Sequence, residues 1–338
     1  MSPVIFDKKN IIIFGGAGFI GSNLCDELVK DNKIICVDNF SSSNSKNIEH
    51  LLSHPNFVFL NHDLVDPLDL ESLEELSRFK VAFQGIQEVY NLACPMSAKN
   101  FMANREKILL ANSTVVKNAL DLALKYKASF LQFSSSVVYG LREDNDQGGR
   151  VAENYIGKTN ILSDRSCYDE GKRFAESMVS TYRQMFDLDG KIIRIFRIYG
   201  PRMALNDDQM LSDFVLNALN NNDLNILGNK DFSSSLCYVD DVVDAAIKVM
   251  RSEFSGPFNV GSEESVQFYD VAKKIVEMTG SQSKINFQPS NIFMTPLNIP
   301  DTFKIRNELN WIPVITLENG LKKTIQDFQA SMQMRMMD

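Results

Sequence analysis

A tyrosine and a lysine stand four residues apart in the segment Tyr168-Asp169-Glu170-Gly171-Lys172, which otherwise reads as helix. Residues with this spacing lie on one helical face, with Cβ atoms roughly 5–6 Å apart. A lysine ammonium so placed favours ionisation of the phenol and lowers its pKa. Such a phenol can remove a hydroxyl proton while hydride leaves the same carbon. The alternative is an ordinary surface pair, so the interpretation depends on a hydride acceptor elsewhere in the chain.

The N-terminal segment supplies a site for such an acceptor. The apolar run 10–14 is typical of a buried parallel strand, and it leads into the glycine-rich stretch 15–21 and then a helical pattern. Glycines at 15, 18 and 21 allow a tight turn and let a diphosphate approach the positive end of the helix. A second apolar run, 34–37, ends in Asp38, which can receive the ribose hydroxyls and would repel a 2′-phosphate. This order of features predicts NAD rather than NADP.

Strand and helix patterns alternate through the first 200 residues. Further strands are expected at 57–60, 88–93, 128–133 and 191–196, and the clearest helical pattern covers 107–127. The alternation predicts an α/β fold with a Rossmann-type doubly wound parallel sheet that binds ligands at the carboxyl ends of its strands.

Two regions of unequal size are expected. Residues 1–200 would form the NAD-binding domain, and 201–338 mainly a smaller C-terminal lobe that binds the substrate, with some segments returning to the sheet. Helices are expected in that lobe at 211–219, 240–250 and 269–279. The polar stretch 141–165 is long enough to be a lid or binding loop.

A third chemical group follows the fifth expected strand, in the serine-rich segment 134–136. A hydroxyl at the carboxyl end of a strand, such as that of Ser135, can share the reacting oxygen with the tyrosine. A serine-rich turn without function is the alternative. The glycine-rich stretch together with the Tyr168–Lys172 pair favours the catalytic interpretation.

The bulk composition restricts the partners. The chain has 35 basic and 43 acidic residues, a net charge of −8, and no long basic run, which argues against nucleic acid or an anionic membrane as a partner. No apolar stretch approaches the ~20 residues of a membrane span, and the N-terminus does not resemble a signal peptide. Five scattered cysteines and three histidines predict reduced thiols in a cytoplasmic protein and no metal site. The Met-rich end, 332–338, would be frayed or would pack against another subunit.

Longer motifs carry a resemblance to a known family; they lie at 14–21, 91–95, 165–173, 199–203 and 237–241. The chain resembles the extended short-chain dehydrogenase/reductases that act as nucleotide-sugar epimerases and dehydratases, and within them the UDP-glucuronate decarboxylases. The resemblance implies tightly bound NAD, a nucleotide-sugar substrate, a homodimer and transient oxidation of the sugar at C4.

The resemblance also implies roles for individual residues. Tyr168 would be the base, Lys172 would tune it and bind the ribose, and Ser135 would complete the catalytic set. The implied cofactor contacts, besides Tyr168 and Lys172, are Gly15, Gly18, Phe19, Ile20, Gly21, Asp38, Asn39, Asp63, Leu64, Leu92, Ala93 and Asn112. The implied substrate contacts are Pro95, Ser136, Tyr155, Arg197 and Arg202.

Several positions depart from the pattern of the decarboxylases. A glutamate beside the substrate is Val137 here, and valine cannot transfer a proton. An expected pyrophosphate arginine is Ser234, the tyrosine next to the nucleotide base is Leu227, and the Arg-Arg-Pro-Asp motif is replaced at 298–301. An asparagine is replaced by Arg197, whose guanidinium could restore phosphate-binding charge or could be an ordinary ion-paired arginine.

These departures leave the oxidising groups whole and deplete those for later steps. We therefore predict an enzyme that oxidises a nucleotide-linked sugar at C4 with NAD, as a 4-epimerase or a C4 dehydrogenase. One alternative is a divergent UDP-glucuronate decarboxylase, because a β-keto acid loses carbon dioxide with little help. The other is a catalytically silent NAD(H)-binding protein. The sequence names neither the sugar nor the base.

Overall fold

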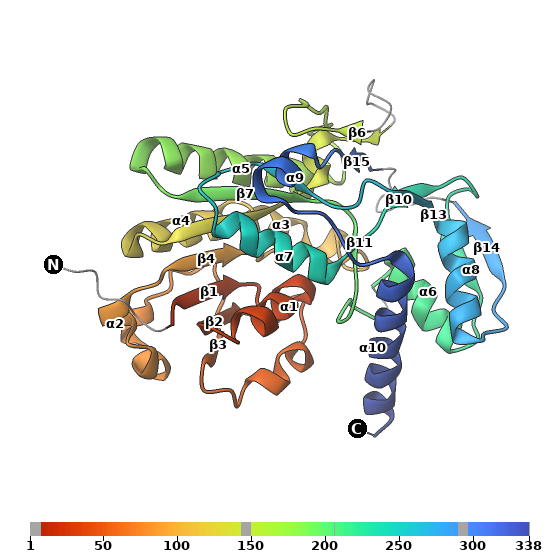
Figure 1. Ribbon diagram of the computed structural model, residues 1–338, viewed down its shortest axis with the longest axis horizontal. Coiled ribbons are helices and arrows are strands. Elements are labelled where there is room, and N and C mark those ends of the chain that lie inside the picture. The colour runs from red at the N-terminus through yellow and green to blue at the C-terminus, as the bar shows by residue number, and fades with distance from the viewer. Residues whose placement is uncertain (1–7, 143–149, 206, 290–296, 338) are drawn as a thin grey trace.

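The computed structural model describes residues 8–142, 150–205, 207–289 and 297–337. Its main feature is a seven-stranded sheet in the order β12-β7-β5-β4-β1-β2-β3, in which every pairing is parallel (Figure 1). The strands are β1 (Asn10–Phe14), β2 (Lys33–Asp38), β3 (Phe57–Asn61), β4 (Glu88–Asn91), β5 (Ser129–Ser135), β7 (Gly190–Ile195) and β12 (Phe258–Val260). The chain runs outward from β1 in both directions, so the doubly wound sheet is confirmed.

Helices cover both faces of this sheet. One face packs against α1 (Phe19–Leu28), α7 (Val239–Met250) and α9 (Phe303–Leu309), and the other against α4 (Thr114–Tyr126) and α5 (Ser166–Phe186). Successive side chains of a strand point to opposite faces, so Ile11 and Ile13 join the first core while Ile12 and Phe14 join the second. Burial on both faces explains why β1 and β2 consist largely of continuous apolar runs.

A smaller lobe lies at one end of the molecule (Figure 1). It contains α6 (Met210–Leu219), α8 (Phe268–Thr279), α10 (Leu317–Met337) and the parallel pair β9 (Leu224–Leu227) and β14 (Ile285–Gln288). Its own core includes the fully buried Phe214, Phe268 and Phe328. Phe19 and Ile20, at the start of α1, pack against that core, so the lobe adjoins the glycine-rich turn.

Short elements connect these parts. Paired strands are β6 (Arg150–Val151) with β15 (Ile299–Pro300), β8 (Ile198–Tyr199) with β11 (Cys237–Tyr238), and β10 (Ser233–Ser235) with β13 (Ser265–Gln267). Short α-helices are α2 (Val81–Gln84) and α3 (Arg105–Ala111). The 3₁₀ helices are η1 (Ser45–Asn47), η2 (Glu49–Leu51), η3 (Leu70–Ser72), η4 (Glu74–Phe79), η5 (Met102–Asn104) and η6 (Ser136–Tyr139).

The prediction of one continuous helix over 107–127 is wrong in one respect: this segment is divided into α3 and α4. The break falls at Asn112 and Ser113, where Ser113 has φ −127° and ψ −83°. The Asn112 side-chain amide donates to the Ile108 carbonyl at 2.8 Å. Asn112 also lies against Gly171 of α5: a Cβ added to Gly171 would be 3.1 Å from the Cβ of Asn112. The helix therefore ends where a short polar side chain packs against α5.

Two other predictions, on the Met-rich end and on the polar stretch 141–165, are answered in part. Helix α10 continues to Met337, so the backbone of the Met-rich end is helical rather than frayed as far as that residue. Of the polar stretch 141–165, residues 143–149 lie outside the described part, and 150–151 form β6. All five cysteines are free.

Among the described residues, no helix is both long and apolar enough to span a membrane.

Candidate functional site

The glycine-rich turn after β1 has no room for side chains. Gly15 adopts φ +75°, and a Cβ there would lie 2.9 Å from the Ala93 nitrogen. A Cβ on Gly21 would lie 2.2 Å from the Gly15 carbonyl oxygen. Only glycine fits such close backbone contacts, so the turn brings the start of α1 directly against the end of β1.

The start of α1 is open to an anion. Gly18 is the N-cap, and within the described residues no side chain caps the helix and no acidic residue occupies its first turn. Gly18, Phe19 and Ile20 line a cavity, and the first N–H groups of a helix have no partner within it. A helix N-terminus with these properties suits a phosphate group.

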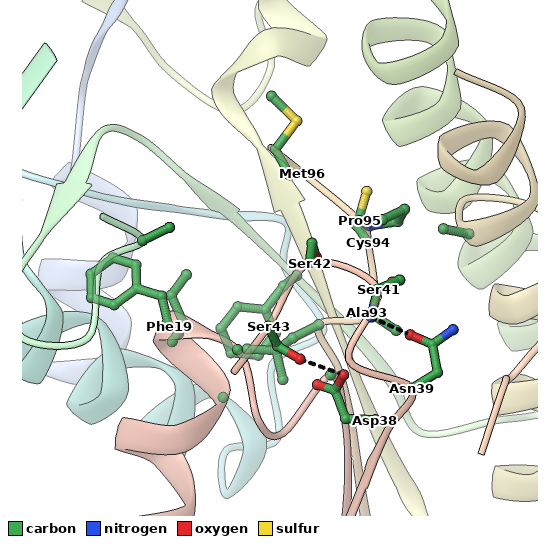
Figure 2. A pocket seen from close by; sticks show the side chains of 18 of the residues that line it. Phe19, Asp38, Asn39, Ser41, Ser42, Ser43, Ala93, Cys94, Pro95 and Met96 are labelled. Atoms are coloured by element: carbon green, nitrogen blue, oxygen red, sulfur yellow. Dashed lines mark hydrogen bonds between the residues drawn. The ribbon is translucent and has the colours of Figure 1, made fainter. Parts of the chain in front are cut away.

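This cavity has a volume of about 1020 Å³ and lies at the carboxyl ends of the strands. Figure 2 shows Phe19 at the start of α1, the loop 38–43 after β2 and the segment 93–96 after β4 around it. The predicted contacts that line it are Gly15, Gly18, Phe19, Ile20, Gly21, Asp38, Asn39, Asp63, Leu64, Leu92, Ala93, Pro95, Tyr168, Lys172 and Arg202. The sheet thus brings most of the expected cofactor contacts together.

Asp38 is more heavily engaged than its sequence position indicates. Its carboxylate accepts from the Ala17 N–H at 3.0 Å, the Phe40 N–H at 2.9 Å and the Ser43 hydroxyl at 2.7 Å (Figure 2). A carboxylate has about four acceptor positions, so one remains for a ribose hydroxyl. Asp38 therefore also fixes the glycine-rich turn relative to the loop after β2.

Asp63 and Asn39 form a joint polar edge of the cavity. Asn39 donates its side-chain amide to the Asp63 carboxylate at 3.1 Å, and the Val65 N–H donates to the same carboxylate at 3.0 Å. Both side chains follow neighbouring strands, β2 and β3, whose carboxyl ends meet at one edge of the sheet.

Tyr168 and Lys172 lie on the first turns of α5. The Lys172 ammonium donates to the Phe133 carbonyl at 3.1 Å and lies 5.7 Å from the centroid of the Tyr168 ring. Burial raises the pKa of Tyr168, an ionised Cys94 would raise it further, and a hydrogen bond with Ser135 lowers it. Burial thus acts against the lowering of the pKa expected from the lysine.

Ser135 reaches Tyr168 from the sheet. It is the last residue of β5, pairs in register with Ile195 of β7, and is buried. Its oxygen accepts the Val137 N–H at 3.4 Å and forms the hydrogen bond that acts on Tyr168. The hydroxyl and the phenol therefore approach each other from β5 and α5.

Five predicted residues do not line the cavity: Asn112, Ser135, Ser136, Tyr155 and Arg197. Asn112 lies behind it, with its amide 3.7 Å from the Cys94 sulfur, so it acts on the packing of α3 against α5 rather than facing the cavity. Tyr155 packs against Tyr139 with ring centroids 6.3 Å apart. Ser136 is buried, and among the described residues its hydroxyl has no hydrogen-bond partner.

The two predicted arginines have different surroundings. Arg202 lines the cavity, but its guanidinium pairs with Asp26 at 2.5 Å and its backbone N–H donates to the Asp327 carboxylate at 2.9 Å. These two contacts join α1 to α10. Arg197 lies over two rings of the smaller lobe, with its guanidinium carbon 5.9 Å from the centroid of Phe232 and 5.5 Å from that of Phe268.

Sequence reasoning missed a contact between the two parts of the molecule. Ser97 donates its hydroxyl to the Asp207 carboxylate, and the Ala98 N–H donates to the same group at 3.3 Å. Asp207 and the neighbouring Met96 line the cavity, so this contact joins the loop after β4 to the segment before α6 at the cavity wall. No local pattern could have found it, because its partners are 110 residues apart.

A buried charge network behind Ser135 was also missed. Arg194 of β7 donates to the two Glu176 carboxylate oxygens at 2.9 and 2.7 Å and to the Tyr139 hydroxyl at 2.8 Å. The Ser134 hydroxyl donates to Glu176 at 2.5 Å. The one signal of this network in the sequence was the charged Arg194 within the apolar run of β7. Among the described residues, no group of three or more His, Cys, Asp or Glu side chains could hold a metal ion.

The glycine-rich turn, the acid after β2 and the Tyr–Lys pair on α5 define a dinucleotide-binding α/β enzyme. Residues 11–261 match the NAD dependent epimerase/dehydratase family, and the chain belongs to it. UDP-glucuronic acid decarboxylase 1 of Danio rerio is 37% identical over 328 residues, which cover 97% of this chain and 74% of that protein. UDP-glucuronic acid decarboxylase 1 of Arabidopsis thaliana is 34% identical over 330 residues, which cover 97% and 72%.

Solved structures share the fold. UDP-glucose 4-epimerase from Thermotoga maritima superposes with a TM-score of 0.82 at 24% identity, over 96% of this chain and 99% of that one. dTDP-glucose 4,6-dehydratase from Bacillus anthracis, solved in complex with NAD, gives 0.80 at 23% identity, over 96% and 98%. This protein is accordingly an NAD-dependent enzyme of the family.

Proposed function

We propose that this enzyme oxidises C4 of a nucleotide-linked sugar, and that it then either returns hydride to C4, as a 4-epimerase, or releases the 4-keto sugar, as a C4 dehydrogenase. The observation that supports this most directly is the convergence of Ser135 and Tyr168, with Lys172 behind the phenol ring, beside the large cavity. A hydroxyl and a phenol so placed can hold one substrate oxygen between them.

Each group then has a definite task. NAD⁺, when bound, supplies the hydride acceptor. Gly15 and the start of α1 would hold its diphosphate, and the remaining acceptor position of Asp38 would take a ribose hydroxyl. Tyr168 takes the proton of the C4 hydroxyl, Ser135 donates to the same oxygen, and the positive charge of Lys172 favours the phenolate.

The segment after Ser135 offers little for a second reaction. Val137 is buried in η6, and its side chain has no proton to transfer. Proton and hydride transfer at C4 alone suffices for epimerisation or for net oxidation, and we therefore favour these two reactions.

The relatives favour one further candidate, a divergent UDP-glucuronate decarboxylase. The decarboxylases of Danio rerio and Arabidopsis thaliana align with almost the whole chain at 37% and 34% identity. A 4-keto uronate is a β-keto acid and loses carbon dioxide without an added acid group, so Val137 does not forbid this reaction.

Mass spectrometry of products separates these outcomes. The purified protein with NAD is incubated with UDP-, dTDP-, GDP- and CDP-sugars, both neutral and acidic. Loss of two hydrogens identifies a C4 dehydrogenase, unchanged mass with altered NMR couplings an epimerase, and loss of carbon dioxide a decarboxylase. If every sugar stays unchanged and the bound cofactor stays in one redox state, the proposal is wrong and the protein is a silent NAD(H)-binding protein.

We also propose that two copies of the chain associate. Helices α3 and α5 pack together and carry the large, exposed apolar side chains of Leu109 and Phe174. A second copy would cover these side chains through a symmetric pairing of the same surface.

A further inference from the structure

The loop after β4 and the segment before α6 are joined by a buried carboxylate. Asp207 accepts hydrogen bonds from the Ser97 hydroxyl, from the Ala98 N–H at 3.3 Å and from the Gln209 side-chain amide at 3.1 Å. Ser97 and Asp207 are each only 7% exposed. We call this contact the Ser97–Asp207 clasp. It connects the sheet to the smaller lobe, because β4 belongs to the sheet and α6 to the lobe.

The Asp207 carboxylate is held by hydrogen bonds rather than by an ion pair. Its three donors are uncharged, and among the described residues no lysine, arginine or histidine pairs with it. A hydrogen bond to an ionised group is roughly twice as strong as one between neutral groups, and burial strengthens it further. Loss of the carboxylate would also leave the Ala98 N–H without its partner. The clasp is therefore a firm connection between the two parts.

The clasp lies at the end of the cavity that holds the catalytic phenol. Asp207 and Met96 line the cavity, and Met96 packs against the same buried cluster as Tyr168 (Figure 2). Strand β4, which leads to this loop, is next to β5 in the sheet. The predicted cofactor contacts Asp38 and Asp63 follow β2 and β3, which lie further along the sheet. The clasp thus fixes the two walls of the cavity relative to each other near the phenol.

We propose that Asp207 is a positioning residue for the substrate, because its clasp with Ser97 holds the two walls of the cavity in place around the sugar. The inference rests on the proposed oxidation at C4, which puts the sugar beside Tyr168. A wall that is already in place costs the substrate little free energy to order, whereas a wall without the clasp must be ordered when the substrate binds. The clasp acts equally on the bound sugar and on the transition state, so it lowers KM and leaves kcat nearly unchanged.

Isothermal titration calorimetry of the NAD-loaded protein tests this with UDP-glucose, UDP-glucuronate and UDP. Asp207→Asn puts an amide donor where an oxygen accepted, so its affinity for both sugars should fall about 10-fold. Its affinity for UDP, which has no sugar, should stay within about twofold of the wild type. With the sugar that the product panel selects, KM should rise by a similar factor while kcat stays within about threefold. Should the panel select another nucleotide, the same three probes are made with that nucleotide.

Ser97→Ala tests whether the two residues act as one unit. This variant removes the hydroxyl donor and should weaken the binding of both sugars about 3- to 10-fold. The double variant Ser97→Ala/Asp207→Asn should bind the sugars about as well as Asp207→Asn alone, because losses at two partners of one contact do not add.

Asp208→Asn is the matched control. Asp208 is exposed, does not line the cavity and adopts φ +53°, a conformation that asparagine tolerates well. The variant removes the same charge from the same segment and should leave all three affinities unchanged. Thermal melting and NAD content establish that each variant is folded. If Asp207→Asn does not fold, Ser97→Ala, which keeps the carboxylate, still decides.

Three results would overturn the inference. Unchanged affinity for the sugars in the folded variants would show that the clasp serves the fold alone. An equal loss for UDP would assign it to the nucleotide half of the substrate. A loss of kcat at unchanged KM would assign it to the chemical step rather than to binding. These outcomes leave the proposed function standing, whereas failure of every nucleotide sugar to bind or react would remove both.

Discussion

Tyr168 needs to lose a proton before it can act as a base, and its environment makes this harder. Burial raises the pKa of the phenol, while the Ser135 hydrogen bond lowers it. The rate of sugar oxidation should therefore rise with pH, and Ser135→Ala should both lower kcat and move that rise to higher pH. The measurement is kcat between pH 6 and 10.

Tyr168→Phe is the reference variant for this series. It should lower kcat by about 10²- to 10⁴-fold at every pH, with unchanged NAD content. If Ser135→Ala lowers kcat but leaves the pH profile of the wild type in place, the serine acts on the substrate oxygen alone and not through the phenol.

Asp213 is an acidic side chain that the fold keeps in an unfavourable place. Burial raises its pKa to about 6, and the charges of Asp208 and Asp207 contribute. A carboxyl whose pKa is higher in the folded than in the unfolded state, where it is about 3.9, destabilises the fold once it ionises. Asp213→Asn should therefore raise the free energy of unfolding at pH 7.5 by about 1 kcal/mol, after allowance for solvent screening.

The gain from Asp213→Asn should be smaller at pH 5, because the folded state then holds its proton, and it should vanish only below the unfolded-state pKa of about 3.9. Urea unfolding at pH 5 and 7.5 gives both values. Glu264→Gln, at an exposed carboxylate, is the control and should change stability little at either pH. A gain from Asp213→Asn that is equal at both pH values would contradict an electrostatic cause.

At the level of elements, the Arg194 network braces the end of β5. Arg194 and Glu176 are only 13% and 12% exposed, and they connect β7 and α5 to both sides of Ser135 through Tyr139 and Ser134. Glu176→Ala leaves the buried guanidinium without its carboxylate and should lower the free energy of unfolding by about 3–5 kcal/mol. Urea unfolding measures this. Glu27→Ala, which breaks the exposed pair with Lys30, should cost at most about 1 kcal/mol. Similar losses in the two variants would show that the network stabilises the fold no more than an exposed ion pair does.

The sequence predicted those elements whose signals are local. The β1 run, the glycine-rich turn and Asp38 follow one another along the chain, so their order alone indicated a dinucleotide site. The break at Asn112 was missed because it depends on Gly171 of α5, which is distant in sequence. Strand β12 was missed because three residues carry too short a pattern, and its pairing with β7 supplies the rest.

The same distinction between local and distant signals explains which residues of the candidate site could be predicted. Tyr168 and Lys172 share a helix, and Ser135 ends a strand, so each could be placed by its own element. Residues whose contacts lie far away in the sequence could not be placed in this way, as with Asp207, which accepts a hydrogen bond from Ser97. Sequence patterns therefore indicated Tyr168, Lys172 and Ser135, whereas contacts between distant segments required the tertiary structure.

At the scale of the whole molecule, the exposed apolar side chains on α3 and α5 predict a dimer. Leu109 and Phe174 are 50% and 53% exposed, and α5 also carries the exposed Met185. Helices that pack side by side and expose such groups can bury them against the same pair in a second copy, which gives a closed twofold assembly. The wild-type protein should therefore elute as a dimer, with its mass measured by light scattering at micromolar concentration.

The double variant Leu109→Glu/Phe174→Glu should shift the population to monomer, because removing charged groups from water at the centre of a small apolar interface costs much free energy. Phe83→Glu is the matched control, since Phe83 is exposed on α2, a different element, and should leave the dimer intact. NAD content and melting temperature of the variants separate loss of association from loss of folding. A wild-type monomer at these concentrations, or a dimer that survives both charges, would show that these helices face solvent in the working enzyme.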